Sequence, residues 1–422
     1  MSIYDIFKKY PKISTDSRNI SQNSIFFSLK GSNYDGNNFA AKALENGASF
    51  AVVDNEKYVL NDKYILVKDS LKSLQNLATE HRNKLKCKVL AITGSNGKTT
   101  TKELCKSVLS KKFRVVSTFG NLNNHIGVPL SILKIKQNTE IAIIEIGASS
   151  LGEISYLCKI AKPNFGVITN IGKAHISGFG SIDGVIKGKT ELYKYLNDNE
   201  GIIFINYKNK ILMNNLPKNS KKILYGDDKN LQFNISLYKC NPFLSVIYKN
   251  IIINTKIIGE YNFENIALAI TIGEYFEIDL LKIKIALENY KPKINRSEFI
   301  YKNSNKVILD AYNANPTSVI KAIENLKNFN EQKIIIILGD MNELGENSEN
   351  EHLNIINTCL KIKISNLILV GKIFNKVNFT NYKSFKSISE LKNYLTFNKE
   401  ENTLYLIKGS RSIKLEEILG YL

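Results

Sequence analysis

The feature that most constrains this chain is an apolar run that passes directly into a polar, glycine-containing segment. Val89–Thr93 has the composition of a buried strand, Thr93–Thr100 (Thr-Gly-Ser-Asn-Gly-Lys-Thr-Thr) follows it, and a helical pattern covers Thr99–Ser110. A strand, a glycine loop and a helix in this order direct backbone amides and a helix N-terminus towards an anion. The pattern predicts a parallel α/β sheet with a phosphate site at one strand end.

Within this phosphate loop, the glycines allow backbone amides to face phosphate, Lys98 supplies a point charge and Thr99 offers a hydroxyl to magnesium. Ile92 stands where the strict P-loop pattern requires glycine, so the segment is a shortened variant. A glycine-lined structural turn is the alternative interpretation. The residues that we expect to bind the nucleotide are Gly94, Ser95, Asn96, Gly97, Lys98, Thr99 and Thr100.

Changes of pattern along the chain predict three domains, with residues 1–85, 86–298 and 299–422. The first stretch has short alternating segments and ends in a helical pattern near Leu71–Lys84. The other two alternate apolar strands with helices, which is typical of parallel α/β sheets. The predicted strands are Val89–Thr93, Ile141–Ile146, Val167–Asn170 and Ile202–Asn206, a β-rich stretch over Leu231–Ile258, and then Val307–Asp310, Ile334–Leu338, Leu367–Val370 and Leu404–Ile407.

Polar residues follow several of these strands, at the edge where α/β sheets bind ligands. Glu145 lies inside the otherwise apolar strand Ile141–Ile146, where an unpaired carboxylate is costly to bury. Magnesium would resolve that cost, because it takes carboxylate oxygens and keeps several waters. His175 follows the strand Val167–Asn170 and is predicted at the same edge, although a structural hydrogen-bonding role is the alternative. We expect the functional edges of the two α/β domains to face each other.

Composition places the chain among globular proteins of a reducing compartment. It has 422 residues and five scattered cysteines without CxxC spacing, and no apolar run reaches the ~20 residues of a membrane span. The formal charge of +19 suggests nucleic acid, but the lysines are spread along a chain that is rich in Asn and Ile and lacks Trp. This pattern favours the interpretation that lysines have accumulated at tolerant, solvated surface positions because the genome is AT-rich. The alternative is a P-loop protein that acts on nucleic acid.

At this level of detail the chain resembles the Mur ligases over essentially its whole length. The phosphate loop continues as Thr101-Lys102-Glu103, and the segments Gly120–Asn124, Glu145–Ala148 and Ile168–Gly172 match the family's central domain. The segments Asp310–Pro316, Leu338–Gly345 and Lys408–Arg411 resemble the members that add a dipeptide. Thr15–Arg18, Phe26-Phe27, Lys30-Gly31 and Asp35-Gly36 look like the family's UDP-sugar domain.

The resemblance implies an α/β fold with a small UDP-substrate domain, a central P-loop parallel-sheet ATPase domain and a C-terminal Rossmann-like domain. It implies that Lys98 contacts ATP and that Mg²⁺ is held by Thr99, Glu145, His175 and a carbamylated Lys189. Asn262 and Asn265 would approach the adenine, where Tyr261 replaces a histidine of many relatives. Arg296 and Asp310 would close on ATP, or else either of them could belong to a surface ion pair. The implied catalytic residues are Lys98, Glu145, His175, Lys189 and Arg296.

By the same resemblance, the expected activity is ATP-dependent joining of D-alanyl-D-alanine to UDP-N-acetylmuramoyl-tripeptide through an acyl phosphate, with release of ADP and phosphate. The expected setting is cytoplasmic peptidoglycan precursor synthesis, hence cell-wall biogenesis, cell shape and division, by a monomer without nucleic-acid binding or membrane insertion. Lys408 and Arg411 suit the dipeptide carboxylate by charge, or else cap a helix. The expected substrate residues are Ser17, Ser32, Asn123, Asn124, Asn313, Asn315, Lys408 and Arg411.

Two related activities compete with this interpretation. The Mur ligase that adds a diamino acid to a UDP-muramoyl dipeptide carries an Asn-Pro-Arg block in its relatives, and this sequence has none. Folylpolyglutamate synthetase is disfavoured by the UDP-type N-terminal segments. The identity of the third peptide residue, lysine or diaminopimelate, is left open.

Overall fold

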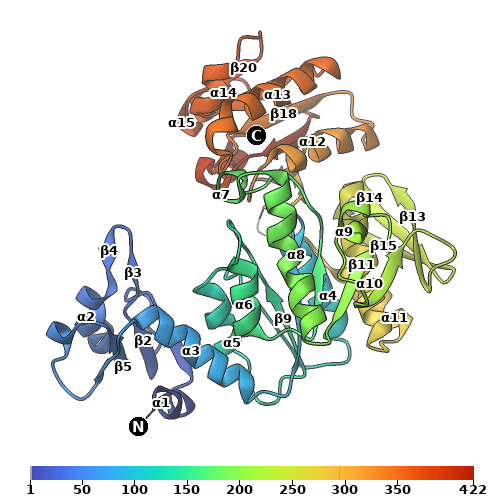
Figure 1. Ribbon diagram of the computed structural model, residues 1–422. Helices are drawn as coiled ribbons and strands as arrows, with labels where there is room; N and C mark the ends of the chain where they lie inside the picture. The colour runs from blue at the N-terminus through green and yellow to red at the C-terminus, as the bar shows by residue number, and fades with distance from the viewer. Residues whose placement is uncertain (1, 294) are drawn as a thin grey trace.

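Three large sheets follow one another along the chain in the computed structural model, which describes residues 2–293 and 295–422. Figure 1 shows the N-terminal part (blue) beside the central part (cyan through green to yellow), with the C-terminal part (orange to red) placed over one end of the central part. Each sheet uses one continuous stretch of sequence. Within the described residues, no helix combines the length and the apolar character that crossing a bilayer requires.

The N-terminal part contains a four-stranded parallel sheet of order β1-β2-β5-β6. Its last helix, α3 (Ser70–Asn83), is capped by the Asp69 carboxylate, which accepts from the Lys72 backbone N–H (2.8 Å). This helix packs against two helices of the central part and so fixes the N-terminal sheet to it. The other elements are α1 (Ile3–Lys9), β1 (Lys12–Ser14), β2 (Ser24–Phe27), β3 (Lys30–Gly31), β4 (Tyr34–Asp35), α2 (Ala40–Glu45), β5 (Ala48–Val53) and β6 (Tyr64–Leu66).

The central sheet has nine strands in the order β15-β14-β13-β12-β11-β10-β7-β9-β8. Strands β7 to β13 pair in parallel, and β13, β14 and β15 form an antiparallel meander. The strands are β7 (Lys88–Thr93), β8 (Val115–Ser117), β9 (Ile141–Glu145), β10 (Phe165–Ile168), β11 (Ile202–Asn206), β12 (Lys221–Gly226), β13 (Phe233–Cys240), β14 (Phe243–Tyr248) and β15 (Ile251–Ile258).

Helices cover both faces of this sheet, which explains why its central parallel strands, such as β7, β9 and β10, are almost continuously apolar. The first central strand, β7, lies between β9 and β10, so the chain leaves it in both directions along the sheet. A reversal of this kind opens a crevice at the carboxyl ends of the strands. The helices are α4 (Lys98–Leu109), α10 (Phe263–Tyr275) and α11 (Leu280–Asn289) on one face, and α5 (Gly127–Leu133), α6 (Glu153–Ala161) and α8 (Ile182–Asp198) on the other, with short α7 (Ile176–Phe179) and α9 (Lys210–Asn214).

The C-terminal sheet has the order β16-β17-β21-β18-β19-β20, and β16 alone is antiparallel. Asp310 at the end of β17 is the register partner of Lys408 at the end of β21. The elements are β16 (Glu298–Lys302), β17 (Asn305–Asp310), α12 (Pro316–Glu324), β18 (Ile334–Gly339), α13 (Ser348–Lys361), β19 (Leu367–Val370), α14 (Lys372–Val377), β20 (Lys383–Phe385), α15 (Ile388–Phe397) and β21 (Leu404–Lys408).

The structure confirms the predicted three-part α/β fold and places every predicted strand close to its expected position. The helix after the phosphate loop begins at Lys98, one residue before its predicted start. Short edge or polar strands, such as β8, β12 and β20, were not predicted, because their sequences lack a continuous apolar run. The exact domain boundaries stay a prediction.

Candidate functional site

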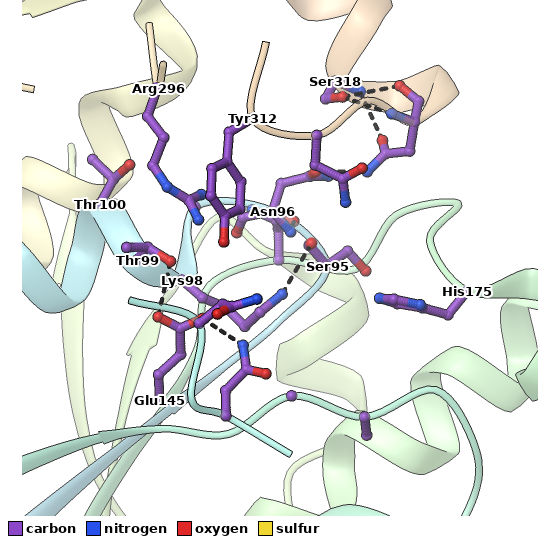
Figure 2. A pocket seen from close by; sticks show the side chains of 18 of the residues that line it. Ser95, Asn96, Lys98, Thr99, Thr100, Glu145, His175, Arg296, Tyr312 and Ser318 are labelled. Carbon is purple, nitrogen blue, oxygen red and sulfur yellow. Dashed lines mark hydrogen bonds between the residues drawn. The ribbon is translucent and has the colours of Figure 1, made fainter. Parts of the chain in front are cut away.

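A cavity of about 560 Å³ lies where the central sheet's carboxyl edge meets the C-terminal part. Its wall contains residues from both parts, which confirms that the two functional edges face each other. Figure 2 shows Lys98, Thr99 and Glu145 on the central side and Arg296 with Tyr312 opposite. The predicted site residues that line it are Ser95, Asn96, Gly97, Lys98, Thr99, Thr100, Asn123, Asn124, Glu145, His175, Asn262, Asn265, Arg296, Asp310, Asn313, Asn315 and Lys408.

The phosphate loop depends on two glycines in left-handed or extended positive-φ conformations. Gly94 has a φ of 136° and Gly97 a φ of 80° at the start of α4. A Cβ on Gly94 would lie 2.0 Å from the Thr169 hydroxyl, so only glycine fits against the neighbouring strand end. The loop therefore opens the N-terminus of a twelve-residue helix directly into the cavity.

The segment after β10 holds the phosphate loop in place. The Ser95 backbone N–H donates to the Asn170 carbonyl (2.9 Å), and the Asn96 N–H donates to Asn170 Oδ1 (3.0 Å). The Thr169 hydroxyl donates to the Asn96 carbonyl (2.6 Å), and the Gly172 N–H donates to the Ser95 hydroxyl (2.9 Å). These bonds fix the loop without any ligand.

Lys98 reaches across this loop into the cavity. Its Nζ donates to the Gly94 carbonyl (2.7 Å) and the Ser95 carbonyl (3.3 Å). The surrounding protein desolvates the ammonium and lowers its pKa; Glu145 opposes this shift, and Arg296 adds to it. Two cations near one cavity create a site that favours an anion such as phosphate.

Glu145, at the end of β9, has both carboxylate oxygens engaged. The Thr99 hydroxyl donates to Oε2 (2.8 Å) and Asn123 Nδ2 donates to Oε1 (2.7 Å). Within the described residues no three His, Cys, Asp or Glu side chains form a metal cluster. A hydroxyl and a buried carboxylate side by side nevertheless fit Mg²⁺, which binds one or two protein oxygens and keeps its waters.

Lys189 is almost fully buried on α8, behind the cavity wall. Its Nζ donates to the Ala148 carbonyl (3.2 Å), and it lies 5.2 Å from the centre of the Phe179 ring. Burial lowers the pKa of Lys189 to about 7, and the Lys98 cation acts in the same direction. The amine is therefore neutral at pH values above about 7, which is the form that reacts with carbon dioxide.

His175 contacts the C-terminal part. Its Nδ1 lies 2.8 Å from Glu343 Oε2, and this hydrogen bond lowers the pKa of Glu343. Both residues have left-handed backbone, with φ of 54° and 66°. The sequence predicted His175 at this edge but did not indicate a partner from the other sheet.

A second polar chain lines the side of the cavity formed by α10. The Thr101 hydroxyl donates to Asn265 Oδ1 (2.9 Å), and Asn265 Nδ2 donates to Asn262 Oδ1 (2.8 Å). Tyr261, which replaces a histidine of many relatives, lies beside them with its hydroxyl 3.1 Å from the Ser297 hydroxyl. The predicted adenine residues are thus brought together next to the phosphate loop.

Arg296 and Tyr312 form the opposite wall. The Arg296 guanidinium carbon lies 3.6 Å from the centre of the Tyr312 ring, and that of Arg411 lies 5.2 Å from the same ring. Among the described residues, no hydrogen-bond partner reaches the buried Nε of Arg296. An arginine held by a ring face alone keeps its donors free for an anionic ligand.

The buried Lys408 forms an ion pair with the partly buried Asp310 at the strand ends. Lys408 Nζ donates to Asp310 Oδ2 (2.5 Å) and to the Asn313 carbonyl (3.3 Å). The Ser297 N–H donates to Asp310 Oδ1 (3.1 Å). The Lys408 charge is thus neutralised by a neighbour, which the sequence did not indicate.

The predicted substrate residues occupy three places. Asn315 Oδ1 caps α12 by accepting from the Ser318 N–H (2.9 Å), and its Nδ2 donates to Asn96 Oδ1 (2.7 Å) of the phosphate loop. Asn124 Oδ1 accepts from the Gly127 N–H (2.8 Å) at the start of α5. Ser17 and Ser32 belong to the N-terminal part and lie outside the cavity wall. Arg411 belongs to the C-terminal part and does not line the cavity either. Their roles stay predictions.

Several residues of this region were missed by the sequence reasoning. Tyr312 and Glu343 line the cavity, and Lys102 is fully buried beside Glu145. Asp340 follows β18 and caps α14, since its carboxylate accepts from the backbone N–H groups of Ile373 (3.0 Å) and Phe374 (2.9 Å). From the sequence alone, a charged residue such as Asp340 could face either the cavity or the terminus of a helix, and the pattern did not distinguish the two.

Fold and site together define a multidomain α/β protein with a phosphate loop that is covered by a second sheet. Three family models match consecutive stretches: the Mur ligase family catalytic domain over residues 9–91, the Mur ligase middle domain over 92–273, and the Mur ligase glutamate ligase domain over 295–411. The chain belongs to the Mur ligase family.

Individual relatives match nearly the whole chain. The UDP-N-acetylmuramoyl-tripeptide–D-alanyl-D-alanine ligase of Bacillus subtilis is 34% identical, covering 96% of this chain and 92% of the relative. The crystal structure of MurF from Acinetobacter baumannii has a TM-score of 0.85 at 30% identity, covering 97% and 92% of the two chains. The MurF ligase of Thermotoga maritima in complex with ADP has a TM-score of 0.85 at 25% identity, covering 100% and 98%.

Proposed function

We propose that this chain is an ATP-dependent ligase that joins D-alanyl-D-alanine to UDP-N-acetylmuramoyl-tripeptide. The observation that carries the proposal is the cavity wall, which combines a phosphate loop and a buried carboxylate from one sheet with Arg296 and Lys408 from another. Full-length relatives named for this reaction support the choice of substrates, and the neighbour solved with ADP supports the nucleotide.

Amide formation requires activation, because a carboxylate is a poor electrophile. In the proposed reaction the tripeptide's terminal carboxylate attacks the γ-phosphorus of ATP, the bond to ADP breaks, and an acyl phosphate forms. The dipeptide amine then attacks the acyl carbon, loses a proton, and phosphate leaves. Catalysis of this kind rests on positioning and on neutralising phosphate charge, which Lys98 and Arg296 would provide from opposite walls.

Thr99 and Glu145 are the residues that we propose to hold Mg²⁺, since their oxygens lie 2.8 Å apart at the loop. Magnesium would neutralise phosphate charge when bound. Lys189 could add an anionic oxygen as a carbamate, which its low pKa of about 7 favours. His175 would contribute its ring nitrogen after exchanging the contact with Glu343.

The C-terminal part is the proposed binding site of the incoming amine. Asn313 and Lys408 line the cavity on that side, across from the phosphate loop. Closure of this part over the loop would exclude water, which otherwise hydrolyses an acyl phosphate. The UDP end would lie at the N-terminal part with Ser17 and Ser32, and Asn123 and Asn124 would contact the peptide portion.

The decisive experiment offers ATP with two substrate pairs. One reaction receives UDP-N-acetylmuramoyl-tripeptide and D-alanyl-D-alanine, and the other receives the UDP-dipeptide with lysine or diaminopimelate. We expect equal release of ADP and phosphate and a dipeptide-added product mass in the first reaction alone. Product in the second reaction alone would identify the chain as the Mur ligase that adds a diamino acid. Turnover with folate and glutamate alone would identify it as a folylpolyglutamate synthetase.

The setting follows from these substrates, which occur in the cytoplasm as precursors of peptidoglycan. We propose a cytoplasmic monomer in cell-wall synthesis, and with it a role in cell shape and division. The charge of +19 would then be surface drift. DNA binding should be weak and should vanish at moderate salt, as expected for counterion release without a specific site.

A further inference from the structure

A fully buried lysine lies beside the proposed metal carboxylate, and the mechanism above does not use it. Lys102 is one helical turn after Lys98 on α4, and none of its side chain is exposed. Removing an ammonium group from water is costly unless partners compensate it. The partners of Lys102 therefore show what its burial achieves.

Two of those partners are backbone carbonyls of one loop, residues 118–124, which follows β8. Lys102 Nζ donates to the Thr118 carbonyl (2.7 Å) and lies 3.5 Å from the Gly120 carbonyl. Its charge is balanced by Glu103 Oε1 at 3.1 Å and Glu145 Oε2 at 3.8 Å. The lysine thus connects the helix of the phosphate loop to the base of the 118–124 loop.

The far end of the same loop holds Glu145. Asn123 Nδ2 donates to Glu145 Oε1 (2.7 Å), and the Asn123 carbonyl accepts from the Gly147 N–H (2.8 Å). At the near end, the Thr118 hydroxyl accepts from the Glu145 backbone N–H (3.0 Å). The orientation of the carboxylate therefore depends on a loop whose base is held by Lys102.

We propose that Lys102 is a positioning residue, which fixes the 118–124 loop and, through Asn123, orients Glu145 and the acyl substrate. The inference rests on the proposed function for its kinetic consequence, although not for its structural one. D-alanyl-D-alanine is expected to bind on the C-terminal side of the cavity, out of reach of this loop. Loss of Lys102 should therefore affect the substrates unequally.

The structural consequence can be measured in the free protein by hydrogen exchange of peptides that cover residues 118–124. Lys102→Met keeps an unbranched chain and removes the charge and the donor. Cys105→Ala is the matched control, because it opens the apolar core under the same helix without reaching the loop. We expect faster exchange in the loop for Lys102→Met alone. Lys102→Gln, which keeps a shorter donor, serves if Lys102→Met does not fold, and it should show an intermediate increase.

The kinetic consequence is a split between Michaelis constants. Lys102→Met should raise the KM for UDP-N-acetylmuramoyl-tripeptide about tenfold, as for a lost charged hydrogen bond, and leave the KM for D-alanyl-D-alanine unchanged. Unchanged loop exchange, or an equal change in the KM values of the two substrates, would overturn the inference, because a merely structural lysine would reduce the active fraction without distinguishing the substrates. A wild-type protein without ligase turnover would refute the proposed function instead, and the exchange result would still decide the role of Lys102.

Discussion

The two walls of the cavity are held together in different ways. The central wall is tied by buried bonds within the central part, such as Thr99 to Glu145 and Thr101 on α4 to Asn265 on α10. The C-terminal wall meets it through pairs that water can reach, among them His175 with Glu343. One wall is therefore assembled by folding of the central sheet, whereas the other is docked onto it.

This difference separates two tasks. Phosphate chemistry needs groups fixed before the substrate arrives, and the central wall provides them. Partly exposed polar pairs contribute about 0–1 kcal/mol each, so the docked wall can leave and return as substrates and products exchange. Substitutions in the central wall should therefore damage the chemical step, and those in the docked wall should weaken binding or closure.

Of the substitutions that test this difference between the two walls, Lys98→Ala should have the largest effect on turnover. We expect turnover to fall by at least about 10²–10³-fold, because a charge acting on the transferred phosphate is lost. The melting temperature should change little, since the loop lies at the sheet edge. Lys106→Ala removes a lysine of the same helix away from the cavity and should retain activity. Near-normal turnover of folded Lys98→Ala would remove the phosphate loop from the mechanism.

Lys189→Ala should also be inactive and should recover partly with added short carboxylates, which can occupy the vacated space as anions. Because burial lowers the pKa of Lys189 to about 7, the reactive neutral amine increases as the pH rises through 7. Carbon-13 NMR with labelled bicarbonate should show the carbamate growing over the same range. The control is Lys187→Ala on the exposed face of α8. Full activity of Lys189→Ala would contradict the carbamate.

Tyr312 tests the docked wall. Its ring lies 3.6 Å from the Arg296 guanidinium, and a cation–π contact contributes about 0.5–2 kcal/mol. Tyr312→Leu should raise the KM for ATP about 2- to 30-fold with a smaller change in kcat, whereas Tyr312→Phe should stay near wild type. Equal loss in both variants would show that the hydroxyl, rather than the ring face, is what matters.

Asn315→Ala should have the smallest effect and separates docking from stability. The change removes the cap of α12, worth about 1 kcal/mol, and the bond to Asn96. Ser387→Ala removes the cap of α15, far from the cavity, and should cost similar stability. Only Asn315→Ala should also raise the KM for ATP by a few-fold. If the two variants behave alike in both stability and the KM for ATP, the bond between Asn315 and Asn96 does not contribute to ATP binding.

The central wall was largely predictable from sequence, and the docked wall was not. The phosphate loop and Glu145 lie within or directly after apolar runs, so local pattern alone placed them at strand ends. Lys102 could not be found in this way, because a lysine beside Glu103 in a helix has the pattern of a solvated pair. Its burial depends on a loop sixteen residues further along the chain.

Contacts between sheets were beyond any local pattern. The bond of Asn315 to Asn96 spans 219 residues, and nothing near either asparagine indicates the other.

Contacts within the C-terminal part also depended on the fold. Lys408 was predicted from its charge as a carboxylate partner, but its neighbour Asp310 follows from the strand order, which places β21 beside β17. Asp340 likewise required knowledge of where α14 begins.

The order of the sheets along the chain has an evolutionary consequence. The chain passes from the central sheet to the C-terminal sheet once, after α11, and all strands of the latter lie within residues 298–408. One contiguous stretch of gene therefore encodes the docked wall, so recombination at a single junction could replace it without touching the phosphate loop. A lineage could acquire a new amine by exchanging that stretch while inheriting the activation chemistry intact.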